Sequence, residues 1–437
     1  MNKILLIILM SSMLYAQGKV LSLKESIELG IQNSKELKLS HSKLNTADAK
    51  LAEINSLFLP QFKLSGNYTR LSDNIPAFEV QLPNAPSKFT ISEPIYDNYS
   101  FRLGFSQPIF TGMKLSSLKS SAHNNIKASL SEISKEENEV AFNIYNAYWN
   151  YYKAEEIKKL ISQSLIQMEE HLRNAKHFFD NGLISKNDLL KLEVQYSNTK
   201  LMLIEAEKNR NLAKMMFNKS IGIELTSDTS VKGDEINEIT INESIEKIFA
   251  EALSERDELK TLSYKLDASK DLINAAKSNW FPSIYLNGNL NYSNPNPRFQ
   301  PPAAEFNTNW ELGLTLSWDI WNWGLTSSQS KQAEETKVQL EVNKEQLIEN
   351  IQQEVYSNYL EMKKNHEKVI VNIDALKQAD ENYRITSEKF RVQIASTTDL
   401  IDAETLKLQA ETNLKTAEVE LQVSKVKLDK SLGRRIF

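Results

Sequence analysis

Strict alternation of apolar and polar side chains marks residues 310–320, which read Trp310-Glu311-Leu312-Gly313-Leu314-Thr315-Leu316-Ser317-Trp318-Asp319-Ile320. A period of two places the apolar side chains on one face of a β-strand. Shortly afterwards, residues 325–432 contain neither proline nor glycine. Uninterrupted helix over about 70 residues would extend for roughly 100 Å, several times the length of an ordinary globular helix. The sequence therefore predicts β-strands continued by very long helices.

Three further segments alternate in the same way, at residues 62–69, 99–106 and 283–292. A tilted strand needs about ten residues to cross a bilayer, and each segment has roughly that length. Aromatic residues stand at the segment ends, as expected for rings at a membrane interface: Tyr68, Tyr99, Tyr292 and Trp310. The alternative is a soluble β-sandwich or edge sheet with one wet face, but four short strands alone would leave open edges.

The 11 prolines fall in two windows, residues 60–108 and 282–302, which also hold the alternating segments. Proline disrupts a helix, so its absence elsewhere leaves the remaining chain free to be helical. One helical segment carries a seven-residue repeat of small residues beside a second row of leucines, which predicts closely packed, supercoiled helices. The two rows are Ala403, Ala410, Ala417, Ser424 and Ser431, and Leu414, Leu421 and Leu428. A soluble coiled coil would share this repeat, so the strands distinguish the two interpretations.

The chain also reads as a duplication of helix, β-hairpin, long helix, turn and long helix. Pro60 and Pro282 are 222 positions apart, whereas Asp188 and Asp399 are 211 apart. The offset changes inside the proline-rich windows, where a loop between paired strands tolerates a difference in length. We therefore assign a first repeat, a linker and a second repeat to residues 17–221, 222–242 and 243–437. The β-hairpins are expected at about 61–109 and 283–321.

Four strands from one chain cannot close into a membrane barrel with a lumen, yet lipid requires every backbone polar group to be paired. Three chains would supply twelve strands, and cyclic symmetry closes such a ring. The strand count therefore predicts a homotrimer in contact with membrane lipid.

The first residues predict an export signal over residues 1–16, since Lys3 supplies a positive charge and an apolar run follows it. A short N-terminal membrane anchor is the alternative. The chain has no cysteine, which excludes a lipid anchor on cysteine, disulfides and thiolate chemistry. The mild net charge of −5 and the lack of a basic stripe argue against nucleic acid as a partner.

The sequence contains no catalytic, cofactor-binding or metal-binding motif. It has no GxSxG sequence, Walker motif or glycine-rich dinucleotide fingerprint. Five histidines are scattered without HExxH spacing and are expected to be solvated: His41, His123, His171, His177 and His366. The sequence thus predicts a protein that is not an enzyme and uses no cofactor.

Two turns between long helical stretches carry the candidate functional residues, which are Gly182, Ser185, Asp188, Ser396, Asp399 and Asp402. Each serine has an acidic residue three positions on, as in a capping box, and the helix dipole favours negative charge there. Asp399 and Asp402 would project from nearly the same helical face. Three chains meeting at this turn would form two stacked carboxylate rings that select for cations.

The order of the elements, the repeat and the motifs Ser22-Leu23-Lys24-Glu25-Ser26-Ile27 and Phe58-Leu59-Pro60 resemble the TolC-like outer-membrane efflux protein family. The resemblance covers the whole mature chain. It implies a mainly α fold with a membrane β-barrel portion, in which a trimeric twelve-stranded barrel is continued by a twelve-helix α-barrel. An equatorial belt would include residues 222–242 and the C-terminal end.

The resemblance also implies acidic rings at the periplasmic aperture, at the positions of Asp399 and Asp402, and docking of a periplasmic adaptor protein at the turns. This chain departs from the best-known members in one respect. Phe390 and Ala395 stand where those members close the tip with a tyrosine and an arginine. The departure argues against a salt-bridge latch at these positions.

The expected function is that of an outer-membrane exit duct, extending into the periplasm, in a tripartite efflux pump or a type I secretion system. Such a duct passively conducts substrates delivered by an inner-membrane transporter and a periplasmic adaptor. The alternative is a periplasmic coiled-coil scaffold or adaptor without a membrane span. The exported substrate is not predictable, because a wide duct contacts its cargo weakly.

Overall fold

The computed structural model describes residues 19–233 and 244–437, so the predicted export signal (residues 1–16) and residues 234–242 of the predicted linker lie outside it. The chain divides into two compact units. A sheet unit comprises Lys43–Ser129 and Thr261–Asn343. A helical unit comprises the described residues up to Ser42, with Leu130–Lys260 and Lys344–Phe437.

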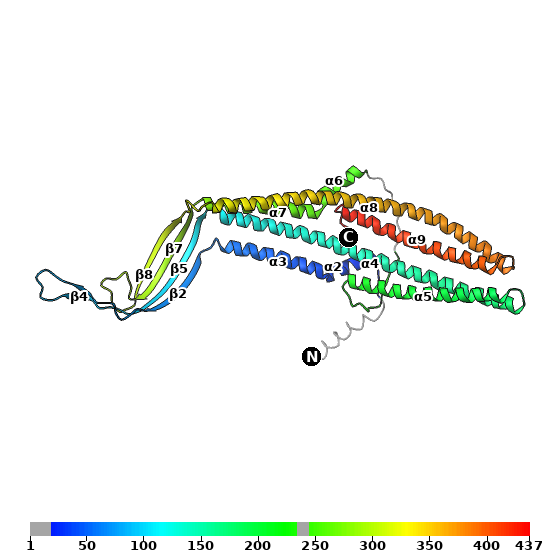
Figure 1. Ribbon diagram of the computed structural model, residues 1–437, viewed down its shortest axis with the longest axis horizontal. Helices are drawn as coiled ribbons and strands as arrows, with labels where there is room; N and C mark the ends of the chain where they lie inside the picture. Colours follow the sequence, from blue (N-terminus) through cyan, green and yellow to red (C-terminus); the bar gives the residue numbers. More distant parts are fainter. Residues whose placement is uncertain (1–18, 234–243) are drawn as a thin grey trace, which may run out of the picture. The chain divides into compact units, whose positions relative to one another are not determined.

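The sheet unit contains one four-stranded antiparallel sheet in the order β2-β5-β7-β8 (Figure 1). Its strands are β2 (Gln61–Arg70), β5 (Asp97–Thr111), β7 (Ser283–Asn294) and β8 (Asn307–Ser317). The four alternating segments therefore each form a strand. The loop between β2 and β5 adds a two-stranded sheet of β3 (Phe78–Val80) and β4 (Phe89–Ser92).

The register gives this sheet one apolar and one polar face. One row across the strands joins Leu64, Leu103, Leu290 and Trp310, and all four side chains are exposed. The next row, on the opposite face, joins Lys63, Gly104, Asn289 and Glu311. Period-two alternation thus has the predicted consequence, and the apolar face has no covering layer within the described chain.

The fourth strand ends earlier than its alternation predicts. Alternation continues to Ile320, but β8 stops at Ser317 because its partner β7 begins at Ser283, directly opposite. The following residues form a turn, in which Trp323 and Gly324 have φ angles of 54° and 82°. The indole of Trp318 donates a hydrogen bond to the carbonyl oxygen of Trp280 at 3.2 Å.

Long helices dominate the rest of the chain, as the distribution of proline predicts. The long helices are α4 (Lys114–Asp180), α5 (Lys186–Ser220), α8 (Leu325–Arg391) and α9 (Thr397–Ser431), and the shorter ones are α2 (Leu23–Asn33), α3 (Lys35–Ser56), α6 (Ile245–Glu255) and α7 (Asp257–Lys277). Helices α4 and α8 have 67 residues each, and α5 and α9 have 35 each. Among the described residues, no helix is both long and apolar enough to cross a membrane.

Small residues and aromatic rings form the core of the helical unit. The predicted rows on α9 are confirmed, because every residue from Ala403 to Ser431 in the small row and all three leucines of the second row are buried. Tyr148, Tyr151 and Phe217 are the largest fully buried side chains. The Tyr151 hydroxyl donates to the carbonyl oxygen of Thr229 at 2.7 Å, on β6 (Thr229–Val231), which pairs in parallel with β1 (Lys19–Leu21). Within the predicted linker, β6 is therefore fixed to the helices.

Candidate functional site at the helix-tip turns

Two turns in the helical unit, residues 181–185 and 392–396, connect α4 to α5 and α8 to α9. In the first, Leu183 N–H donates to the Phe178 carbonyl and Gly182 N–H to the Phe179 carbonyl, both at 2.8 Å. The second turn repeats this pattern, with donation from Ile394 to Lys389 at 2.8 Å and from Gln393 to Phe390 at 2.9 Å. Both are Schellman motifs, which satisfy the last carbonyl groups of a helix.

The two Schellman motifs differ at the residue that adopts the left-handed conformation. Gly182 has φ +72°, and Gln393 occupies the matching position with φ 63°. A residue with a Cβ loses about 1 kcal/mol in this conformation, whereas glycine adopts it freely. The first turn is therefore relaxed and the second carries a small strain.

We expect Gln393→Gly to raise the free energy of unfolding by about 1 kcal/mol, and Gly182→Ala to lower it by about the same amount. No atom lies within 4 Å of a Cβ built on Gly182, so the loss there is conformational and not steric. Denaturation midpoints of the two variants would measure both effects. A loss of stability in Gln393→Gly would show that the glutamine side chain makes a contact worth more than the strain.

Serine caps begin the helix after each turn, as the spacing predicts. Ser396 Oγ accepts from Asp399 N–H at 3.1 Å, while the Asp399 carboxylate accepts from Ser396 N–H at 2.9 Å and from its hydroxyl at 2.7 Å. These hydrogen bonds, first from the hydroxyl and then from the backbone, lower the pKa of Asp399. At α5, Ser185 caps Asp188 N–H at 3.2 Å, but the reciprocal backbone bond is absent from the described contacts, so only the second turn has a complete capping box.

Asp402 lies one helical turn beyond Asp399 and is exposed. Its carboxylate makes no hydrogen bond or ion pair with the described part of the chain, whereas that of Asp399 is held by its cap. The two carboxylates predicted to act alike therefore differ.

Lys191 on α5 connects the two turns, a role that its position in the sequence does not reveal. Its ammonium donates to Thr398 Oγ1 at 3.0 Å and lies 3.9 Å from Asp188 Oδ1. The first turn thus places a cation beside the start of α9. The contact spans 207 residues, so only the tertiary structure discloses it.

An apolar cluster, formed by residues of the helices that the two turns connect, packs next to both turns. Phe390 is only 5% exposed and packs edge-on against Phe178, with ring centroids 6.0 Å apart. Ala395 packs against the same cluster, as does Leu400. Phe390 thus belongs to the packing inside one chain.

At the surface of the turns, a groove of about 460 Å³ runs between the two, with Gly182, Leu183, Gln393 and Ser396 among its lining residues. Apolar side chains project beside it. Leu183 is exposed, and Ile394 is 75% exposed. The helix tips therefore combine an apolar surface with the acidic residues of the caps.

One expectation about the histidines is wrong. His171 is largely buried and contacts Tyr383 Oη at 3.1 Å through Nε2. Burial lowers its pKa, and the nearby Glu170 acts in the opposite direction. No group of three or more potential metal ligands occurs within residues 19–233 and 244–437.

The family pattern described as outer membrane efflux protein matches residues 27–222 and 248–434 of this chain. The match covers most of the sequence, so the chain belongs to the outer membrane efflux protein family, a family of transport proteins located in the outer membrane and extending into the periplasm.

Two curated relatives agree with this assignment. Outer membrane protein TolC of Vibrio cholerae is 21% identical over 305 residues, which are 69% of this chain and 66% of that protein. The alignment thus spans slightly less than two thirds of TolC. Outer membrane efflux protein BepC of Brucella suis is 19% identical over 374 residues, or 85% of this chain and 76% of BepC.

Solved structures show the same fold. The CmeC outer membrane channel of Campylobacter jejuni has a TM-score of 0.78 at 18% identity, covering 94% of this chain and 85% of CmeC. The open state of the MtrE outer membrane channel of Neisseria gonorrhoeae has a TM-score of 0.75 at 17% identity, covering 95% and 89% of the two chains.

Proposed function

We propose that three copies of this chain form a passive exit duct through the outer membrane. An inner-membrane transporter, either an efflux pump or a type I secretion transporter, would supply its substrates through a periplasmic adaptor. The observation that carries the proposal is the four-stranded sheet with one exposed apolar face, one polar face and two unpaired edges. Lipid covers such an apolar face, and water fills the side of the polar face.

The unpaired edges support the trimer. Strands β2 and β8 are the outer strands of the sheet, so the backbone donors and acceptors on their outer sides pair with no strand of the described residues. Pairing β8 of one copy with β2 of the next satisfies these groups, and three copies close the ring. Helices of equal length in the two repeats, offset by 211 residues at both ends, suit a closed helical continuation.

Aromatic contacts support an interface with the membrane at the loop end of the sheet. Tyr68 and Tyr99 have ring centroids 5.0 Å apart, and Phe306 lies 6.0 Å from Tyr99 and 4.8 Å from Tyr292. These rings join β2, β5 and β7 in one band. Amphipathic rings of this kind occupy the headgroup level of membrane barrels.

The helix-tip turns are the proposed contact for the adaptor and the proposed selectivity site. A groove with a mainly polar lining runs between the turns, and the exposed Leu183 and Ile394 offer apolar contacts to the adaptor. Around the symmetry axis, Asp399 and Asp402 would form two rings of carboxylates. The free carboxylate of Asp402 contributes more to ion binding than the capped one of Asp399.

Conductance tests the function directly. Purified protein in planar bilayers should give long-lived channels, and the same preparation should contain heat-resistant trimers in the outer-membrane fraction. A freely soluble monomer released by osmotic shock would favour the alternative of a periplasmic scaffold.

Asp402→Ala is expected to lower the cation preference of these channels and their block by divalent cations, with little loss of stability because the side chain has no described partner. Asp399→Ala in addition should weaken both properties further and cost up to about 1 kcal/mol, because it removes the reciprocal half of the capping box and a negative charge at the helix N-terminus. Reversal potentials in a salt gradient measure the preference. Unchanged potentials in the double variant would eliminate the ring hypothesis.

A further inference from the structure

A polar cluster is buried inside the helical unit, among α4, α8 and α9. Ser164 and His171 lie two turns apart on α4, Tyr383 lies on α8, and Glu404 lies on α9. Ser164 Oγ donates to Glu404 Oε1 at 3.3 Å, and His171 Nε2 lies 3.9 Å from Glu404 Oε2. The same His171 nitrogen contacts Tyr383 Oη at 3.1 Å. The cluster therefore joins three helices through one carboxyl group.

Glu404 is only 3% exposed, and its Oε2 has no hydrogen-bond partner within the described residues. A buried carboxylate needs compensating donors, whereas a neutral carboxylic acid is far easier to bury. Burial raises the pKa of Glu404 to about 7, although Ser164 and Lys407 act in the opposite direction. The geometry and the pKa thus agree that this carboxyl group changes protonation near neutral pH.

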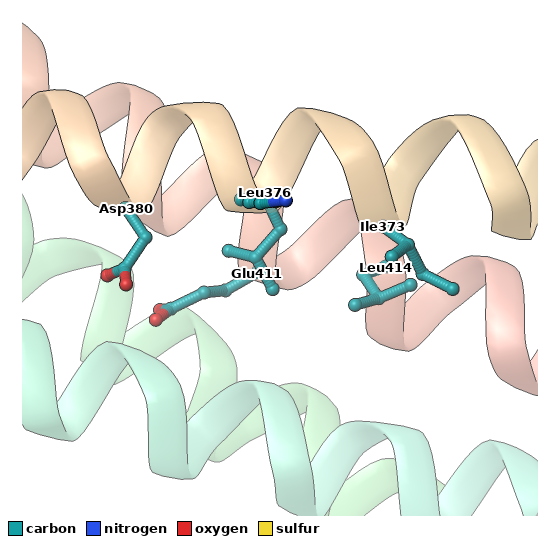
Figure 2. Close-up of a pocket in the computed structure, with 6 residues that line it drawn as sticks. Ile373, Leu376, Asp380, Glu411 and Leu414 are labelled. Carbon is teal, nitrogen blue, oxygen red and sulfur yellow. The ribbon is translucent and has the colours of Figure 1, made fainter.

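The charged groups around the cluster do not neutralise Glu404. Lys407 forms an ion pair with Asp380 at 2.6 Å, and its ammonium also lies 4.9 Å from the centroid of the Tyr383 ring. Asp380 and Glu411 line a neighbouring groove of about 330 Å³ between α8 and α9, where Figure 2 shows both carboxylates at the same end of the groove. Lys407 thus pairs with the carboxylate of Asp380 and not with that of Glu404. His171, kept neutral by burial, is the closest basic group.

We propose that Glu404 is a proton-dependent contact that fixes α9 against α4 when protonated and loosens this packing when ionised. The Glu404 contact lies close to the turn between α8 and α9, because Glu404 follows Asp399 by five residues on α9. Leu400, between them, is fully buried in the cluster beneath both turns. Rising pH therefore loosens the start of α9. Regulation of a pore by this contact rests on the proposed function, whereas the contact itself does not.

The direction of the pH dependence follows from the difference in the pKa of Glu404 between the closed and the opened state. The folded protein holds the Glu404 proton up to about pH 7, whereas an opened, solvated glutamate loses it near its ordinary value. Opening therefore becomes more favourable as pH rises through this window, by at most about tenfold per unit for one proton. His171, with its lowered pKa, acts oppositely, since opening lets it bind a proton at acidic pH. Comparison of wild type with a Glu404 variant isolates the carboxyl contribution.

Hydrogen exchange in the full-length protein tests the proposal. Opening of amides 400–410 is measured between pH 5 and pH 7 and divided by the intrinsic exchange rate at each pH. The ratio of opening in wild type to opening in Glu404→Gln should rise at least tenfold across this range. Glu169→Gln, the same change at an exposed position of α4, should leave the corresponding ratio constant within about twofold. A ratio for Glu404→Gln that does not change with pH would overturn the proposal.

Infrared spectroscopy of the unmodified protein gives a second test that needs no variant. A protonated-carboxyl band should persist at pH 6, where ordinary glutamates are ionised, and disappear by pH 8.5. Absence of the band at pH 6 would also overturn the proposal. Neither measurement depends on conductance, so a protein that forms no channels but passes both tests would refute the proposed function and leave the contact standing.

Discussion

Leu314→Arg is expected to eliminate heat-resistant trimers from the outer membrane. Leu314 lies on the exposed apolar face of β8, in register with Leu286. If lipid covers this face, each arginine costs about 2–4 kcal/mol near the middle of the bilayer. Three copies raise the cost to about 6–12 kcal/mol, which is comparable to the whole free energy of unfolding of a typical protein. Outer-membrane fractionation followed by gel electrophoresis without heating measures the effect.

Gly313→Arg provides the matched control, because Gly313 precedes Leu314 and faces the polar side of the sheet. No atom lies within 4 Å of a Cβ built there, so the side chain has room to reach water. This variant should assemble normally and change only the conductance. Equal loss of trimer in the two variants would contradict the assignment of the apolar face to lipid.

Arg256→Ala is expected to lower the free energy of unfolding by about 2 kcal/mol, since it removes a buried guanidinium that joins two more exposed carboxylates and a backbone carbonyl. Arg256 is 9% exposed, and its guanidinium forms a bidentate contact with the Glu258 carboxylate, with N···O distances of 3.0 Å and 3.1 Å. It also donates to Glu354 at 2.9 Å and to the backbone carbonyl of Ser431, at the end of α9, at 3.1 Å. Its removal leaves a buried carbonyl without this donor and two carboxylates without a cation.

Arg384→Ala is the control for this prediction. Arg384 makes a slightly shorter bidentate contact with Glu381, at 2.8 Å for both bonds, but both side chains are exposed. An exposed pair contributes about 0–1 kcal/mol, so the variant should remain close to wild type in thermal or denaturant unfolding. Similar losses in the two variants would show that burial does not determine the contribution of Arg256.

The sequence predicts the elements well where a single periodicity governs a long segment. Alternation identified all four strands, and the heptad rows on α9 identified its buried face. The end of β8 was misplaced because alternation in Trp318 and Ile320 continues past the last residue that β7 can pair with. A strand boundary depends on its partner, which the alternation of one segment does not encode.

The turns are predictable in part, because their caps depend on residues close together in the sequence. Ser396 and Asp399 cap α9 through local hydrogen bonds, so their spacing suffices to find them. Glu404 and His171 gave no such signal. The hydrogen bond from Ser164 to Glu404 joins residues 240 positions apart, and burial by α4 and α8 is what makes the carboxyl group unusual. Helical periodicity cannot separate a buried glutamate from a solvated one on the same face.

The unpaired edges of β2 and β8 have a genetic consequence. In the proposed trimer, the edge strands of each copy pair with those of its neighbours. One chain with a defective edge strand therefore prevents closure of the barrel. Co-expression of equal amounts of wild-type and edge-defective chains would leave roughly an eighth of the trimers free of defective copies. Such alleles should therefore be dominant, whereas a chain that never folds should be recessive.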